Sequence, residues 1–191
     1  MIRVGIGGWT YEPWRGTFYP AGLKHADELA YASQRLTTIE INGTFYRSQS
    51  PASFKKWRAE TPDDFVFSVK GHRAVVNNRK LAEAIEPIAW FFRSGLLELG
   101  DKLGPILWQF APFKKFDPED FRNFLGLLPR EADGRPLRHV VEVRHQSFLV
   151  PEFVTLLREH NVAVVFAASD EYPAITDVTT DFVYARLQRT K

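Results

Sequence analysis

The sequence predicts an α/β fold: a TIM-barrel-like (β/α) barrel of parallel strands. Short apolar segments with strand character alternate with amphipathic helical segments along the whole chain. Such alternation implies parallel strands joined by right-handed helical crossovers. About seven strands are expected, each carrying a polar residue near its C-terminal end, where (β/α) barrels place their binding sites.

The expected elements follow one another in a regular order. Strands are expected at residues 2–9, 36–42, 65–70, 105–110, 137–144, 162–167 and 181–187, and helices at 27–36, 51–59, 79–99, 118–128 and 151–160. A doubly wound open sheet is the alternative. It is disfavoured because the glycines of residues 5–8 lie inside the first strand and do not open a helix, as a dinucleotide-binding loop would.

Local signals support several of these boundaries. Ser50 precedes Pro51 and Asp117 precedes Pro118, which are capping residues followed by proline at the first helical position. The segment 79–99 contains Pro87 and Gly95, so its helix is expected to bend.

Composition limits the classes of function. A chain of 191 residues is long enough for one domain, expected to span 1–191. There is no cysteine, which excludes disulfides and thiolate metal sites. The net charge of +2 gives no independent argument for a nucleic-acid partner. No apolar run approaches the ~18 residues of a membrane span, and the start lacks the layout of a signal peptide, so a cytoplasmic protein without a membrane partner is expected.

The stretch His139-Val-Val-Glu-Val-Arg-His145 is central to the functional prediction. With the two-residue period of a strand, Glu142 and Arg144 point away from the side that carries Val141 and Val143. A parallel strand buried on both faces is normally apolar, so these charges need a reason. They form either a structural ion pair or part of a functional site at the C-terminal end of the strand.

The same pattern recurs on other strands. If the polar sides of the strands face the barrel interior, its C-terminal mouth gathers cations, carboxylates and amides. The cations outnumber the carboxylates there, which suits an anionic or polyhydroxylated ligand such as a phosphate or sugar acid. A closed network of salt bridges is the structural alternative. The residues expected at the mouth are Glu40, Asn42, Lys70, Gln109, Glu142, Arg144 and Arg186.

Roles follow from the chemistry of these side chains. Glu40, Lys70 and Glu142 are the expected catalytic residues, with either glutamate as general base and the lysine as electrophile, proton donor or Schiff-base nucleophile. Such groups suit an enzyme of hydrolase, lyase or isomerase type. The other side chains are expected to bind the ligand, with the arginines holding an anion; they are Asn42, Gln109, Arg144, His145, Ser147 and Arg186.

No cofactor is predicted. Two glutamates, His145 and Asp170 form a conceivable set of ligands for a divalent metal. No His-x-His or His-Glu-x-x-His spacing is present, and the nearby cations would oppose metal binding, so no metal-binding residues are assigned.

Aromatic residues supply a second hypothesis. Trp9 and Tyr11 belong to an aromatic loop that also contains Trp14, and Tyr46 follows the second strand. Their rings are expected to stack on a sugar or a base, or else to plug one side of the barrel. With the basic residues they suggest nucleic-acid binding or processing as the alternative function.

Several motifs together resemble the DUF72 (YecE-like) family, whose members have a TIM-barrel-like fold and no assigned reaction. The resemblance covers nearly the whole chain in the right order, and the residues reached by strand alternation fall within the family's motifs. The motifs are Gly8-Trp9-Thr-Tyr-x-x-Trp14-x-Gly16-x-Phe18-Tyr19-Pro20, Glu40-Ile-Asn42-x-Thr44-Phe45-Tyr46, Phe67-Ser-Val-Lys70, Gln109 and Glu142-Val-Arg144-His145-x-Ser147.

The chain also departs from that family. Val76-Asn77 stands where Thr-His is usual, and Phe148 stands where tryptophan is favoured. The usual Arg-Leu-His-Gly appears as 186–189, Arg-Leu-Gln-Arg, and the final helix and eighth strand are not present by residue 191. The resemblance therefore implies a C-terminally truncated barrel with the last unit missing. Its open edge is expected to favour oligomerisation, and a non-catalytic remnant is a further alternative.

Overall fold

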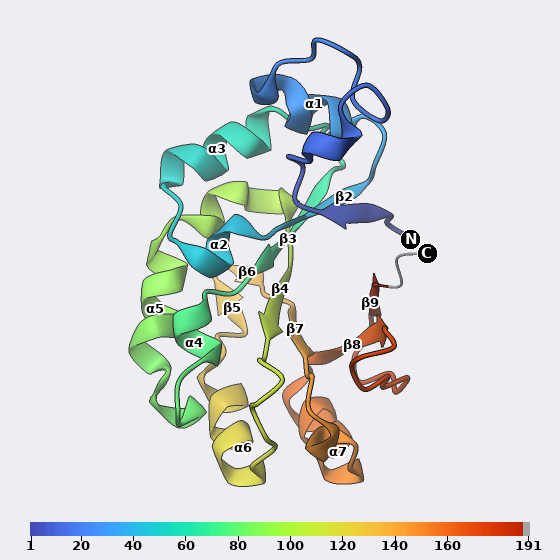
Figure 1. Cartoon of the computed structure of the whole chain (residues 1–191). Helices are drawn as coiled ribbons and strands as arrows, with labels where there is room; N and C mark the ends of the chain where they lie inside the picture. Colours follow the sequence, from blue (N-terminus) through green and yellow to red (C-terminus); the bar gives the residue numbers. More distant parts are fainter. Residues whose placement is uncertain (189–191) are drawn as a thin grey trace. The chain divides into compact units, whose positions relative to one another are not determined.

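The computed structural model of the chain describes residues 1–188 (Figure 1). The chain divides into two compact units, Met1–Lys70 with Phe92–Gly104, and Gly71–Phe91 with the chain from Pro105 onward. The expectation of a single domain over residues 1–191 stays a prediction. Arg189, part of one family motif, lies outside the described residues.

The first unit contains three parallel strands and the beginning of a fourth. The strands are β1 (Gly5–Gly7), β2 (Thr38–Ile41), β3 (Val66–Lys70) and the start of β4 (Leu103–Gln109). The helices are η1 (Glu12–Trp14), η2 (His25–Asp27), α1 (Glu28–Ser33), α2 (Gly43–Tyr46), α3 (Pro51–Ala59) and η4 (Leu96–Lys102).

The two faces of this sheet differ in character. Ile39 lies opposite Phe67 on the neighbouring strand, and both side chains are fully buried. Glu40 lies opposite Ser68 on the other face, because successive side chains of a strand alternate in direction. The apolar face is the core of the first unit, and the polar face carries the carboxylate.

Helix α3 is held at both ends by side chains. Ser50 caps its N-terminus by accepting a hydrogen bond from the Ser53 N–H at 3.1 Å. Beyond its C-terminus, the Lys102 ammonium donates to the carbonyl oxygens of Arg58 and Thr61, both at 2.7 Å. The Arg58 oxygen is one of the helix-end acceptors without a helical partner, and Thr61 follows two residues after the last residue of α3. The segment that returns to the first unit is thereby fixed to α3.

The second unit contains the rest of the strands. They are the main part of β4, then β7 (His139–Glu142), β8 (Ala163–Ala168) and β9 (Tyr184–Leu187), with a small hairpin of β5 (Glu131–Ala132) and β6 (Arg135–Pro136). The helices are α4 (Arg73–Val76), η3 (Leu81–Glu83), α5 (Ile85–Arg93, whose last residues belong to the first unit), α6 (Pro118–Leu127), η5 (Gln146–Phe148) and α7 (Pro151–His160).

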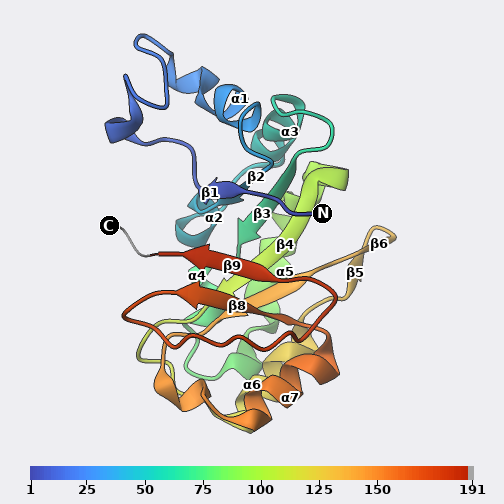
Figure 2. The same cartoon turned by 90° about the vertical axis from the view of Figure 1, so that its right-hand side faces the viewer.

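Two apolar layers cover the sheet of the second unit. Helices α6 and α7 lie side by side (Figures 1 and 2). Phe124 of α6 packs against Trp108 of β4 and against Phe110, the residue after β4, with 6.1 and 5.5 Å between ring centroids. On the opposite face, β4, β7 and β8 contribute a cluster of small and branched side chains, against which Phe182 and Tyr184 pack. That cluster is Leu107, Val140, Ala163, Val165 and Ala167.

The strands follow the order β1-β2-β3-β4-β7-β8-β9, which is chain order once the β5–β6 hairpin is left aside. The pairings β1–β2, β2–β3, β4–β7, β7–β8 and β8–β9 are all parallel. Sequential parallel strands are typical of a (β/α) barrel, as predicted. Within residues 1–188, no helix combines the length and the apolar character needed to cross a membrane.

The structure differs from the sequence prediction in three places. The single helix expected over 79–99 is wrong: α5 ends at Arg93, and Gly95 adopts φ of 104°, a left-handed conformation that ends a helix. The first strand covers only Gly5–Gly7. The β5–β6 hairpin was not predicted, and its turn residues Asp133 and Gly134 both have positive φ.

Candidate functional site

Two polar clusters contain most of the predicted site residues, one in each unit. In the first unit, Glu40 on β2 and Lys70 at the end of β3 are buried, with 6% and 7% of their surface exposed. Asn42 follows β2 directly. Gly7 of β1 lies opposite Glu40, and a Cβ atom on Gly7 would lie 2.8 Å from Asn42 Nδ2. Glycine at this position therefore makes room for the amide beside the carboxylate.

The Lys70 side chain lies against α2, the short helix after β2. Its ammonium lies 4.6 Å from the centroid of the Phe45 ring, within the range of a cation–π interaction. The Thr44 hydroxyl donates to the Lys70 carbonyl oxygen at 2.6 Å, which links the end of β3 to α2. The motif that follows β2 thus contacts both the ammonium and the backbone of Lys70.

The predicted aromatic residues of the first unit have different environments. The Trp9 ring packs against Trp57 of α3, with 5.3 Å between centroids. The Tyr11 hydroxyl donates to the Gly7 carbonyl oxygen, and its ring packs on Trp14. Tyr46 has 64% of its surface exposed. Trp9 and Tyr11 therefore contribute to packing, whereas Tyr46 presents a ring to solvent.

The cluster of the second unit is built around the Glu142 carboxylate, which is 1% exposed. Arg144 Nε donates to Oε1 at 2.9 Å, and Arg186 Nη1 donates to Oε2 at 2.6 Å. Gln109 Nε2 also donates to Oε2, at 2.8 Å. Gln109 lies opposite Glu142 in the pairing of β4 with β7, and Arg186 lies opposite Ala167 of β8. The parallel register and a small residue on β8 allow these side chains to meet.

Charge determines the protonation state of this cluster. Burial by itself would raise the pKa of Glu142, but the adjacent Arg186 and Arg144 guanidiniums and the Gln109 amide hold that pKa below its ordinary value. The carboxylate is therefore ionised at neutral pH. The Arg144 and Arg186 guanidiniums both pair with this one carboxylate. The Arg144 guanidinium also lies 4.4 Å from the centroid of the Tyr172 ring.

His145 and Ser147 form the loop that follows β7. His145 is the N-terminal capping residue of η5, and its Nδ1 accepts from the Ser147 N–H at 3.1 Å. Ser147 Oγ lies 2.8 Å from the same Nδ1 and accepts from the Phe116 N–H at 2.8 Å. These contacts join the loop after β7 to the loop after β4.

The structure also shows contacts that the sequence did not indicate. Tyr172, against Arg144, and Phe45, against Lys70, were not predicted as site residues, although Phe45 stands beside Tyr46 among the aromatic residues that follow the second strand. Among residues 1–188, no group of three or more His, Asp and Glu side chains is arranged to hold a metal ion. That the residues of both clusters line one common mouth of the barrel stays a prediction.

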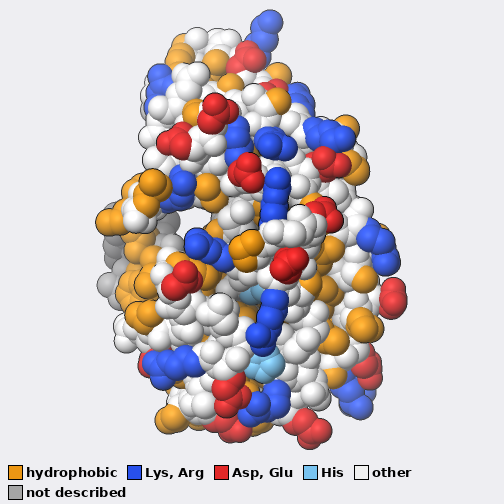
Figure 3. All heavy atoms as spheres, turned by 180° about the vertical axis from the view of Figure 1, so that it is seen from behind, with side chains coloured by type: hydrophobic (Ala, Val, Ile, Leu, Met, Phe, Trp, Pro, Cys, Tyr) orange, Lys and Arg blue, Asp and Glu red, His pale blue; other side chains and the backbone are white. Residues whose placement is uncertain are grey.

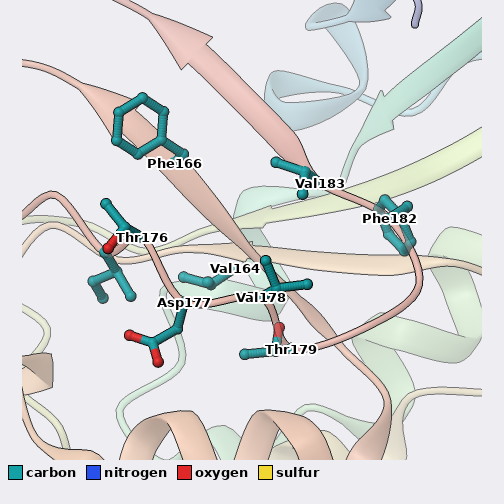
Figure 4. A pocket seen from close by; sticks show the side chains of 9 residues that line it. Val164, Phe166, Thr176, Asp177, Val178, Thr179, Phe182 and Val183 are labelled. Atoms are coloured by element: carbon teal, nitrogen blue, oxygen red, sulfur yellow. The ribbon is translucent and has the colours of Figure 1, made fainter. Parts of the chain in front are cut away.

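A cavity of about 250 Å³ in the second unit lies apart from these residues (Figure 4). Its lining contains none of the predicted site residues. Its one carboxylate, Asp177, accepts a hydrogen bond from Arg158 at 3.2 Å. The cavity is otherwise lined mainly by apolar side chains of β8 and the segment leading to β9, which are Val164, Phe166, Ile175, Thr176, Val178, Thr179, Phe182 and Val183.

Surface charge is mixed on the face shown in Figure 3. Lys and Arg side chains are interspersed there with Asp and Glu, and they form no continuous basic area.

Comparison with known proteins identifies the family. The family model described as "Protein of unknown function DUF72" matches residues 3–191. The chain belongs to the DUF72 family. Among solved structures, the crystal structure of a DUF72 family protein from Thermotoga maritima is 27% identical, with a TM-score of 0.78 over 97% of this chain and 73% of that one. The TIM-like α/β fold predicted from the sequence is thereby confirmed.

Other DUF72 relatives agree with this assignment. A DUF72 family protein from Enterococcus faecalis is 19% identical, with a TM-score of 0.72 over 94% of this chain and 67% of that one, which supports the fold alone. UPF0759 protein YunF of Bacillus subtilis is 24% identical over 80% of this chain and 54% of its own length. UPF0759 protein YecE of Escherichia coli K12 is 26% identical over 78% and 50%. The chain spans about half the length of these curated relatives.

Proposed function

We propose that this DUF72 protein binds a small anionic or polyhydroxylated molecule, with Arg144 and Arg186 as its anion-binding residues. The observation that carries the proposal is the Arg144 guanidinium, which is partly exposed and is oriented through its Nε–H by the buried Glu142 carboxylate. A guanidinium held at one edge in this way presents its other N–H groups to an anionic ligand.

The hydrogen bonds of Arg144 are consistent with this role. Its Nε–H donates to Glu142, and within residues 1–188 its remaining N–H groups have no protein acceptor. Its side chain is 19% exposed, so a ligand has access to it. Guanidinium groups with free donors bind phosphate and carboxylate oxygens in a bidentate manner. Glu142 then acts mainly by holding the arginine, since a carboxylate with a lowered pKa is a weak base.

The catalytic part of the proposal concerns the first unit. Glu40 and Lys70 are buried acid–base groups, and we propose them as general base and as proton donor or electrophile in a reaction of hydrolase, lyase or isomerase type. The test is a screen of phosphate esters and sugar acids with the Glu40→Gln and Lys70→Met variants. Loss of turnover in both variants with folding intact is expected. Full turnover in both would remove these residues from the mechanism.

The binding proposal is tested directly by titrating the protein with inorganic phosphate at low ionic strength and measuring the heat of binding by calorimetry. Arg144→Gln is expected to weaken binding about tenfold or more, because a hydrogen bond to a charged group contributes roughly 1.5–3 kcal/mol. Arg158→Gln is the matched control, since this arginine belongs to the same unit and pairs with Asp177 at 3.2 Å. Equal phosphate affinity in all three proteins would refute the proposal.

Nucleic-acid binding and a non-catalytic role are the alternatives predicted from the sequence. Oligonucleotide affinity that falls steeply with added salt, without any phosphate binding, would favour the first. Phosphate binding without turnover of any tested substrate would favour a binding role without catalysis.

A further inference from the structure

The loop after β7 fixes the proton of one histidine. The Phe116 backbone N–H can only donate, so Ser147 Oγ accepts in their 2.8 Å hydrogen bond. The single hydroxyl proton of Ser147 is then available for His145 Nδ1, which lies 2.8 Å from Oγ. The Ser147 N–H donates to the same Nδ1 at 3.1 Å. Nδ1 is therefore an acceptor for two donors and carries no proton.

This assignment determines the state of the other ring nitrogen. A neutral imidazole carries its proton on one nitrogen, so the proton of His145 is on Nε2. The imidazole is half-buried, and within residues 1–188 no protein atom accepts a hydrogen bond from Nε2. The loop thus presents one oriented N–H donor that the fold itself does not use.

We infer that His145 donates its Nε2–H to an oxygen of the bound anion, and that Ser147 is a positioning residue that sets this tautomer. The inference rests on the proposed function, because the donor directly follows Arg144 in the loop after β7. Ser147 uses both its acceptor and its donor capacity within the loop. It therefore acts on the ligand through His145 and makes no ligand contact of its own.

A purely structural role of the loop predicts something different. The capping of η5 needs only an acceptor for the Ser147 N–H, which an asparagine side chain provides as well as a histidine. The His145→Asn variant thus keeps an acceptor for the cap and removes the Nε2–H donor. It separates the structural from the ligand-binding contribution of this residue.

The tautomer is measured by two-bond ¹H–¹⁵N correlation NMR on the full chain, with the His145 signals assigned by their loss in His145→Asn. The proton is expected on Nε2 in the wild-type protein and in Ser147→Thr, which retains a hydroxyl. Ser147→Ala is expected to show a mixture of the two tautomers. A wild-type spectrum with the proton on Nδ1 would overturn the assignment of Ser147.

The donor is tested by phosphate titration. His145→Asn is expected to lower phosphate affinity about tenfold at unchanged melting temperature, as for the loss of one hydrogen bond to a charged group. Ser147→Ala is expected to lower phosphate affinity less than His145→Asn does. Ser147→Thr is expected to keep the phosphate affinity of the wild type. Unchanged phosphate affinity in His145→Asn would refute the inference.

The two proposals fail in different ways. If Arg144→Gln weakens phosphate binding and His145→Asn does not, the arginine site stands and the histidine donor is wrong. If the wild-type chain binds no phosphate, or if Arg144→Gln binds it as tightly as the wild type, the proposed function itself fails.

Discussion

Two buried glutamates, one in each unit, show how differently a fold can treat the same side chain. Glu28 begins α1, is 0% exposed, and pairs with Arg15 of the aromatic loop. Within the described chain, its Oε2 has no hydrogen-bond partner. Glu142 is buried to a similar degree, yet both of its oxygens accept hydrogen bonds, from two arginines and a glutamine.

The difference lies in the balance of charge and of hydrogen bonds. Around Glu28, Arg15 is the main cation, and it joins the aromatic loop to α1; His25 adds to this pair when protonated. Around Glu142, two guanidiniums and one amide donate to the carboxylate, and the Arg144 side chain is partly exposed. A single buried ion pair is typical of a structural link, whereas a partly exposed guanidinium that uses one edge on a buried carboxylate suits ligand binding.

The largest expected effect comes from Glu142→Gln. Removing this charge deprives two neighbouring guanidiniums of the carboxylate that they share, and breaking a buried ion pair typically costs about 3–5 kcal/mol. The free energy of unfolding in urea is expected to fall by that amount. Phosphate should stabilise the variant more than the wild type, because the arginines then lack their carboxylate. A variant as stable as the wild type would contradict the importance given to this cluster.

Acid should weaken the second unit before the first. His139 accepts from Trp108 Nε1 at 3.1 Å and donates to the Pro129 oxygen, and burial lowers its pKa to about 4. Because the folded pKa lies below the unfolded value of about 6.5, stability is lost as pH falls between these values, by roughly 3 kcal/mol. Glu142, whose pKa is also lowered, adds a further loss at lower pH.

Hydrogen exchange at pH 7 and pH 4.5 measures this contrast. Amides of β7 and β8 are expected to lose protection on acidification. His139→Gln, which keeps an acceptor and a donor, is expected to remove much of the pH dependence. Equal loss of protection in both units would contradict the predicted difference.

The smallest expected effect is that of Glu28→Gln. The amide keeps the shape of the side chain and an acceptor for Arg15, so the cost is expected to be about 1–2 kcal/mol. Phosphate affinity should not change, since the proposed anion site involves neither residue. A melting curve and the same calorimetric titration check both statements. Weakened phosphate binding would show that the structural assignment of Glu28 is wrong.

Much of the fold could be predicted because its signals are local. The alternation of apolar and polar residues identified β2, β3 and β7, and it distinguished the Glu40 side of β2 from the Ile39 side. Capping residues placed the starts of α3 and α6 at Pro51 and Pro118, as predicted.

Other features depend on contacts between distant residues. Tyr172 lies in a loop 28 positions after Arg144, and no local pattern relates the two. The burial of Glu28, at the start of α1, likewise depends on its ion pair with Arg15, which lies in the aromatic loop. The β5–β6 hairpin was missed although Asp133-Gly134 is typical of a two-residue hairpin turn, because the flanking strands are only two residues long.

The return of residues 92–104 to the first unit has a consequence for the newly made chain. On the ribosome, Lys102 emerges only after residues 71–91, which belong to the second unit, have already been synthesised. Until Lys102 has been synthesised, the carbonyl oxygens of Arg58 and Thr61 lack the hydrogen bonds that the Lys102 ammonium donates to them in the finished fold. The N-terminal third of the polypeptide must therefore wait for later sequence before it can mature, and the halves cannot fold one strictly after the other.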